Sequence, residues 1–359
     1  MKRAFAQRRH ALQAEFARSK LDHLLVTKPV NLYYLVGFTG DAGALVVSRE
    51  GSSLIADGRF LAQAREETTG IRIVLQKGSQ LSSVGALLEA AGSRRAGFDP
   101  DQLTVAQLQA LRKASGSRLR WIAAPGLVEK LRMRKEDVEL ARMRRAGVVA
   151  GQVLEGILPL LKPGIREIEI RGEIEYQMRR RGSGPSFESI VAFGKRTALP
   201  HARPTAKRLR KNELVVLDLG VILAHYCSDI TRTVFAGRAP ARVRLWYKAV
   251  HEAQEAAITA VKDGAICRDV DAAARRVLAG HGLDRYFVHG TGHGLGLEVH
   301  EEPRVARGQE RRLVPGNVIT IEPGVYIAGV GGIRIEDDVA VHAGRTEVIT
   351  RVRRDFIEL

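Results

Sequence analysis

Four carboxylic acids lie in or beside strongly apolar segments of this 359-residue sequence. Asp218 lies in VVLDLG, Glu322 in VITIEPG and Glu336 in GIRIEDD, and Asp229 follows Asp218 in CSDITRT. Burying a carboxylate costs free energy unless a partner compensates its charge. An ion pair with arginine explains one such acid well. Four acids in two similar segments favour a carboxylate cluster that two divalent cations neutralise.

The two acid-bearing segments share one form. LDLGV (217–221) and IEPGV (321–325) each place Gly-Val shortly after an acid, and a second acid follows 11 or 14 residues later. This pattern indicates an internal repeat of two hairpins whose carboxylates converge. Two metals about 3.5–4 Å apart, bridged by carboxylates and water, are a known hydrolytic arrangement. Oxygen ligands with one nitrogen favour manganese, cobalt or iron and also permit zinc.

An imidazole for such a site can come from a glycine-rich segment. His289 directly precedes GTGHGLGLEVHEEPR (290–304), which contains His293 and His300. The three histidines are therefore spaced by four and seven residues. A helix could place the first two on one face, but each glycine costs a helix roughly 1 kcal/mol relative to alanine. We therefore expect a strand or an irregular segment whose backbone passes close to another group.

The first third of the chain alternates strand and helix signals. Strands are predicted in HLLVT, GALVVS, SSLIA and IRIVLQ, and helices follow the last two. This alternation is typical of an α/β layer domain. The basic N-terminal segment is interpreted as an amphipathic helix with Phe5, Leu12 and Phe16 on one side, although it also resembles an Arg-rich transit peptide.

A change of pattern marks a second domain. Pro125-Gly126 interrupts the sequence, and a long helical pattern follows, so we predict domains at 1–128 and 129–359. In the second domain, helical stretches separate two pairs of apolar runs, each pair joined by a short turn. These features predict an α+β domain in which helices pack against a curved antiparallel sheet.

Composition excludes several classes of protein. No run of about 18 apolar residues predicts a membrane span, and no apolar stretch resembles a secretory signal. Two cysteines, Cys227 and Cys267, fit a reducing, cytoplasmic location and are expected to be buried. The net charge of +17 is spread along the chain without interleaved aromatic residues. It indicates either solvated surfaces or a surface that binds polyanions.

The segment 130–350 resembles the pita-bread metallopeptidases, which include methionine aminopeptidase, prolidase and aminopeptidase P. The metal ligands of that family are Asp, Asp, His, Glu and Glu in chain order. The resemblance places them on Asp218, Asp229, His293, Glu322 and Glu336. It implies that His293 is the single imidazole ligand, and the neighbouring glycines would let its backbone approach the metal centre.

Three further histidines match catalytic or pocket positions of the family. The resemblance implies that His201 contacts substrate near the scissile bond, that His300 stabilises the developing oxyanion, and that His289 lines the substrate pocket. Glu322 would act as general base as well as ligand. No role is implied for the remaining histidines, which are interpreted as structural: His10, His23, His251, His281 and His342. Asp337 and Asp338 are also interpreted as structural.

The proline-specific branch of the family fits best. The segments NLYYLVGFTG (31–40) and LIADGRFLAQA (54–64) resemble the creatinase-type N-terminal domain, which methionine aminopeptidases lack. Arg334 would share a strand face with Glu336 and orient Asp218 beside the substrate. Arg304 matches an arginine that holds the terminal carboxylate of substrate in prolidases.

The resemblance therefore implies a homodimeric peptidase that cleaves the bond between an N-terminal residue and proline, using a hydroxide that bridges two Mn²⁺ or Co²⁺ ions. Fe²⁺ and Zn²⁺ are also compatible with the ligand set. Both prolidase, which cleaves dipeptides, and aminopeptidase P, which cleaves longer peptides, are compatible with the sequence. The sequence also permits a non-peptidase enzyme on the same fold, or a binding module for nucleic acid or another polyanion.

Overall fold

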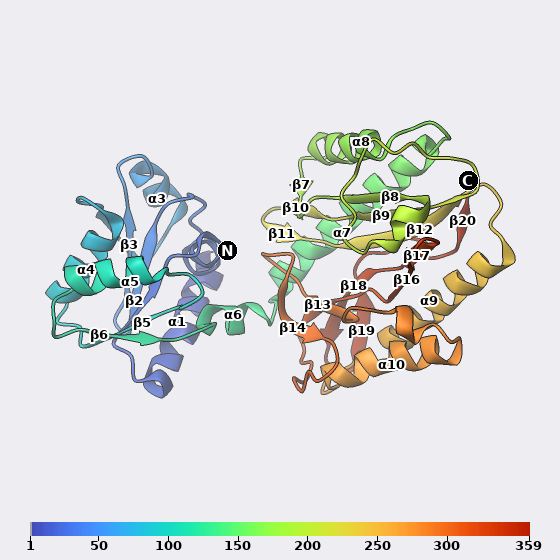
Figure 1. Ribbon diagram of the computed structural model, residues 1–359. Coiled ribbons are helices and arrows are strands. Elements are labelled where there is room, and N and C mark those ends of the chain that lie inside the picture. Colours follow the sequence, from blue (N-terminus) through green and yellow to red (C-terminus); the bar gives the residue numbers. More distant parts are fainter. Residues whose placement is uncertain (1) are drawn as a thin grey trace. The chain divides into compact units, whose positions relative to one another are not determined.

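The computed structural model describes residues 2–359 and divides into two compact units, Met1–Arg132 and Met133–Leu359. Each unit has its own sheets and its own core (Figure 1). None of the helices within the described residues is long and apolar enough to cross a bilayer.

The first unit is a six-stranded mixed sheet between helices. Its strands, in the order β4-β3-β2-β1-β5-β6, are β1 (His23–Val26), β2 (Ala44–Ser48), β3 (Ser52–Ala56), β4 (Arg72–Leu75), β5 (Arg95–Phe98) and β6 (Arg120–Ala123). Its helices are α1 (Lys2–Ser19), α2 (Pro29–Val36), α3 (Leu61–Glu67), α4 (Gln80–Ala90), α5 (Val105–Ala114) and α6 (Leu127–Arg132). The predicted alternation of strands and helices is confirmed.

The helices α4 and α5 cover one face of this sheet, where Leu25, Val46 and Ile55 meet Val84 and Leu88. The predicted apolar side of α1 is buried, with both Leu12 and Phe16 fully enclosed. An amphipathic helix with this much buried apolar surface is a structural element of the folded unit.

The second unit contains the helices and strands that carry the predicted site. Its helices are α7 (Asp137–Ile157), α8 (Glu167–Arg180), α9 (Ala241–Ala260), α10 (Cys267–Gly280) and the short 3₁₀ turns η1 (Leu158–Leu160), η2 (Gly194–Ala198) and η3 (Asp284–Tyr286). Its first seven strands are β7 (Gly184–Pro185), β8 (Ile190–Phe193), β9 (Glu213–Leu219), β10 (Val221–Leu223), β11 (Tyr226–Cys227), β12 (Ile230–Ala236) and β13 (Gly292–Gly294). The others are β14 (Glu301–Val305), β15 (Val318–Ile321), β16 (Gly324–Ile327), β17 (Gly331–Arg334), β18 (Asp337–His342), β19 (Arg345–Val348) and β20 (Ile357–Glu358).

The long helical pattern predicted after Pro125-Gly126 is confirmed, and it is divided into two helices, α6 and α7. The backbone N–H of Lys135 donates to the carbonyl of Gly316 at 2.7 Å. Glu136 then caps α7 through a capping box with Glu139. Lys135 bonds outside the helix and Glu136 is a capping residue, so the chain leaves helical geometry at both positions.

The second unit is built from two similar halves. In the first, α7 and α8 pack on the sheet β20-β12-β9-β8, and in the second, α9 and α10 pack on β14-β13-β15-β18-β19. The turns that lead into α8 and α10 have the same conformation. Gly164 and Gly264, 100 positions apart, both have positive φ, and their backbone N–H groups donate to the carbonyls of Leu209 and Leu313 respectively. In Figure 1 the strands of both halves lie between α8 on one side and α9 and α10 on the other.

The predicted acid-bearing hairpins are the antiparallel pairs β9–β12 and β15–β18. Their connections are longer than the short turns predicted. Each contains a hairpin of its own, β10–β11 in the first half and β16–β17 in the second. The two halves meet through β12 and the β17–β18 region, where the buried Arg232 forms an ion pair with the buried Asp337 at 2.9 Å.

Candidate metal centre and active site

The segment that carries His293 is a strand held tightly between two neighbours. β13 pairs with β14 and β15, and its register with β14 shifts between Gly292 and Gly294, so His293 lies at a bulge. A Cβ on Gly292 would lie 1.8 Å from the carbonyl oxygen of Thr320, and one on Gly294 would lie 2.3 Å from that of Glu302. The close approach that the structure shows at these glycines is to the backbone of the adjacent strands.

His293 presents an unprotonated ring nitrogen to the carboxylates. Its Nδ1 lies 3.0 Å from the carbonyl oxygen of Gly294, which can only accept, so Nδ1 carries the proton. Its Nε2 then carries a lone pair, 3.5 Å from Oε1 of Glu322 and 3.9 Å from Oδ2 of Asp229. Burial lowers the pKa of His293 to about 4, so the ring is neutral at pH 7, which is the form that binds a metal.

The carboxylates come from corresponding ends of the two hairpins. Asp229 directly precedes β12 and Glu336 directly precedes β18, while Asp218 lies in β9 and Glu322 directly follows β15. Within residues 2–359, Asp229 and Glu336 form with His293 a group whose ligand atoms all lie within 4.8 Å of one another.

Two of the acids at this centre each keep one carboxylate oxygen without a partner among residues 2–359. Oδ1 of Asp218 and Oδ1 of Asp229 are buried, and within the described residues neither has a hydrogen-bond partner. Burial, reinforced by the surrounding carboxylates, raises the pKa of Asp229 and of Glu336 well above the ordinary range. Burial also raises the pKa of Glu322 to about 8. Unpaired carboxylate oxygens beside a neutral imidazole fit divalent cations, which would remove this penalty.

A buried arginine links the two hairpins. Arg334, only 4% exposed, donates to Oδ2 of Asp218 at 2.5 Å and to the hydroxyl of Tyr326 at 2.8 Å. Its Nε lies 3.1 Å from Oγ1 of Thr231, which donates to Oε2 of Glu336 at 2.6 Å. Arg334 thus fixes the orientation of one predicted ligand directly and of a second through Thr231.

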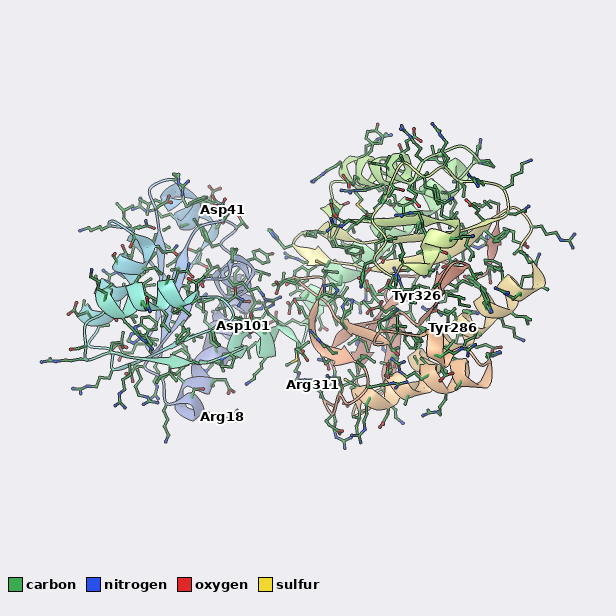
Figure 2. The ribbon with its side chains drawn as sticks, viewed as in Figure 1. Arg18, Asp41, Asp101, Tyr286, Arg311 and Tyr326 are labelled. Carbon is green, nitrogen blue, oxygen red and sulfur yellow. The ribbon has the colours of Figure 1, made fainter. Side chains whose placement is uncertain are left out.

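Tyr326, which lies in β16 and is labelled in Figure 2, extends this network to His289. Because the Tyr326 hydroxyl accepts from Arg334, it donates its own proton to Nε2 of His289 at 2.9 Å. Nδ1 of His289 donates to the carbonyl of Gly290 at 2.7 Å. Both nitrogens of His289 are used within the chain, and contact with a substrate requires one of these bonds to open.

The remaining predicted residues lie at the exposed side of the centre. The ring of His300 lies 4.4 Å from the ring of His293, centre to centre. Partial burial lowers the pKa of His300, and the nearby His201 and Arg304 lower it further. Arg304 and His201 are exposed on β14 and on the loop after η2. The structure therefore brings His201, His300 and Arg304 together as basic groups beside the carboxylates.

The comparisons with known proteins agree with this geometry. The model of "Metallopeptidase family M24" matches residues 141–343, and that of "Creatinase/Prolidase N-terminal domain" matches residues 8–134. The chain belongs to metallopeptidase family M24. It has the pita-bread fold of that family, preceded by a creatinase-type domain, and it is a peptidase and so a hydrolase.

Several relatives of this M24 peptidase match nearly its whole length. It is 32% identical over 342 residues to an Xaa-Pro dipeptidase from Pyrococcus horikoshii, covering 95% of each chain. An Xaa-Pro dipeptidase structure from Bacillus anthracis superposes with a TM-score of 0.96 at 37% identity, covering 99% of this chain and 100% of that one. A structure of X-Pro aminopeptidase from Thermotoga maritima gives a TM-score of 0.89 at 29% identity, with 95% and 98% covered. The chain is therefore similar to both kinds of proline-specific peptidase.

The structure also adds residues to this M24 site that the sequence patterns do not single out. Thr231 and Tyr326 connect Arg334 to Glu336 and His289. Asp338, predicted to be structural only, accepts the backbone N–H of Asp229 at 3.1 Å and so holds that predicted ligand in place. Among these residues, only Tyr326 could have been singled out from the sequence as a site residue, because it is a polar aromatic residue that directly follows the apolar IEPGV segment.

A second set of supporting residues comes from α10. Asp271, 1% exposed, accepts the backbone N–H and the hydroxyl of Thr291 at 3.1 and 2.8 Å. Thr291 in turn accepts the backbone N–H of Glu322 through its carbonyl at 2.8 Å. The segment that carries His293 is thereby fixed to α10 on one side and to Glu322 on the other.

Proposed function

We propose that this peptidase hydrolyses the bond between an N-terminal residue and proline with two bound divalent cations. One observation carries the proposal. The buried carboxylate of Asp229 has one oxygen without any hydrogen-bond partner in the described residues and lies beside Glu336 and the lone pair of His293. An ionised carboxylate in that position is compatible with a stable fold only if a cation neutralises it.

Asp218, Asp229, His293, Glu322 and Glu336 are the proposed ligands. Two divalent cations would balance the four carboxylates, whereas a single cation would leave a net charge of about −2. Cations bound there would supply Lewis acidity, which lowers the pKa of water towards neutrality. The set of four carboxylates and one imidazole favours Mn²⁺ or Co²⁺.

Glu322 is the proposed general base. Its carboxylate lies 3.5 Å from His293 and is 18% exposed, so it lies in the cluster and at its accessible side. With cations bound its carboxylate would be ionised, and it could take a proton from water and return it to a leaving nitrogen. The proline nitrogen requires that proton because it leaves as an amine.

The basic groups beside the cluster would bind the substrate. His300 and His201 can donate hydrogen bonds to the scissile carbonyl as negative charge develops on its oxygen. Arg304 is exposed and forms no ion pair with the described residues, so its guanidinium is available to a carboxylate. In a dipeptide that carboxylate belongs to proline itself, which supports prolidase activity over cleavage of longer peptides.

Hydrolysis of Ala-Pro compared with Ala-Pro-Pro-Ala tests the proposal. We expect cleavage that a chelator abolishes and that Mn²⁺ or Co²⁺ restores, with two ions bound per chain by elemental analysis. Arg304→Ala should raise KM for Ala-Pro, while Arg311→Ala, a change in the segment that follows β14, should not. Metal-loaded protein that cleaves neither peptide would refute the Xaa-Pro specificity.

The homodimer implied by the family resemblance is part of the proposal. Light scattering on the metal-loaded protein measures the mass directly. A mass of one chain would contradict it.

A further inference from the structure

A cavity of about 400 Å³ lies along α10 and includes none of the proposed metal ligands. Its wall is one face of α10, on which residues three or four apart in sequence lie together. The loop after β14 and the turn η3 complete the wall. The charged residues that line it are Arg268, Asp271, Arg275, Arg276, Asp284 and Arg307.

Two of these charges form a fixed floor. Arg275 pairs with Asp271, with Nε 2.7 Å from Oδ2. The same guanidinium donates to the carbonyl oxygens of Phe287 and His289. Because Arg275 and Asp271 neutralise each other, they add rigidity to the cavity but little net charge.

The other cations are less fully paired. Arg276 and Arg307 are exposed, and neither forms a hydrogen bond or an ion pair with the described residues. Arg268 faces Asp269 and Glu310, which offset its charge. Asp284 is the remaining acid in the wall. Once these pairs cancel, the wall keeps a net charge of at most +1, and two guanidinium groups remain free as donors.

The internal repeat shows that the fold does not require arginine on this face. The positions of α8 that correspond to Arg268 and Arg276, 100 residues earlier, are Ile168 and Tyr176, which are 50% and 56% exposed. Both halves keep the helix and the turn before it. The fold therefore does not require Arg268 or Arg276, and in the second half Arg275 connects the cavity to the backbone that leads to His293.

We propose that this cavity binds a small molecule that carries a phosphate group. A phosphate is dianionic near pH 7 and accepts paired hydrogen bonds from guanidinium groups. The volume of about 400 Å³ exceeds that of a phosphate ion and lies within the range of small-molecule sites. The ligand chemistry is the phosphate group, whether it arrives as the free ion or on a nucleotide.

Calorimetric titration of the metal-loaded protein tests this site with two probes, inorganic phosphate and AMP. The variant Arg276→Ala/Arg307→Ala removes both free guanidinium groups from the cavity. The matched control, Arg210→Ala/Arg238→Ala, removes two exposed arginines of the same unit that lie outside the cavity. We expect the first variant to lose at least about tenfold in affinity for a bound probe, and the control to retain the wild-type affinity.

The outcomes separate the sources of the phosphate and the failure of the idea. Saturable binding of phosphate alone identifies a site for the free ion, and tighter binding of AMP identifies a nucleotide or a similar ligand. Binding that survives in the Arg276→Ala/Arg307→Ala variant places the anion elsewhere, for example at the metals, and refutes the proposal. So does an equal loss in both variants, or the absence of saturable binding of either probe.

Discussion

Removing the metals should make the stability of the catalytic unit fall as pH rises. Glu322 has a pKa of about 8 in the metal-free fold, against an ordinary value of 4.5. A carboxyl whose pKa is raised by folding binds its proton more tightly in the native state. Its contribution is fully present below pH 4.5 and is lost as pH rises to about 8. The difference in pKa corresponds to roughly 4–5 kcal/mol for this one group.

The measurement is urea unfolding of chelator-treated protein between pH 5 and pH 8.5, following the transition that added Mn²⁺ shifts. Glu322→Gln is the informative variant, because its amide cannot ionise. Without metal it should be more stable than the wild type at pH 8 and should show a shallower pH dependence. The metal-loaded wild type should show little loss over the same range, since bound cations keep the carboxylates ionised.

The reasoning would be refuted by metal-free protein whose stability is flat or increases between pH 5 and pH 8.5. Such a result would mean that Glu322 is already ionised and compensated by groups of the chain itself. The role proposed for the cations would then lose its electrostatic basis.

Three further predictions concern the groups that support the site. Arg334→Lys keeps the charge but loses the paired donors to Asp218 and Tyr326, so metal affinity should fall roughly 10–100-fold in a titration monitored by activity; unchanged affinity would contradict the orienting role. Tyr326→Phe leaves the buried Arg334 without one acceptor and should destabilise the protein by about 1–3 kcal/mol in urea, and an unchanged midpoint would argue against it. Gly292→Ala forces a Cβ against the carbonyl of Thr320 and should lower the free energy of unfolding by about 3 kcal/mol or more. Gly172→Ala, in open space on α8, should raise it by about 0.5–1 kcal/mol. Similar urea midpoints for the two variants would refute the close packing of β13.

The sequence predicts secondary-structure elements well where they depend on the pattern of apolar residues within one segment. The strands β1 to β4 and the apolar side of α1 follow from apolar runs and helical spacing, which depend on neighbouring residues, whereas β5 and β6 are not among the predicted strands. The acid-bearing hairpins are predictable for a different reason. A carboxylate within an apolar run needs a compensating partner, which is either a basic residue or a metal ion. The presence of two similar acid-bearing runs favours a shared carboxylate cluster.

The features that the sequence does not predict depend on contacts distant in sequence. The helix break before α7 depends on Lys135 pairing with Gly316, and nothing near Lys135 indicates that partner. Thr231 and Asp338 act through residues about 100 positions away, so their local sequence gives no hint of a role. The glycines beside His293 correctly indicate a close approach, but the sequence alone does not say which group approaches.

The division of the proposed ligands between the two halves has a consequence for synthesis of the chain. Glu322 follows Asp218 by 104 residues, which a ribosome adds in roughly 5–20 s. For most of that interval the first two acids are without His293, and for all of it they are without the glutamates that complete the cluster. The centre cannot assemble until Glu336 is translated, so metal loading has to follow synthesis of the acid-bearing hairpins of both halves.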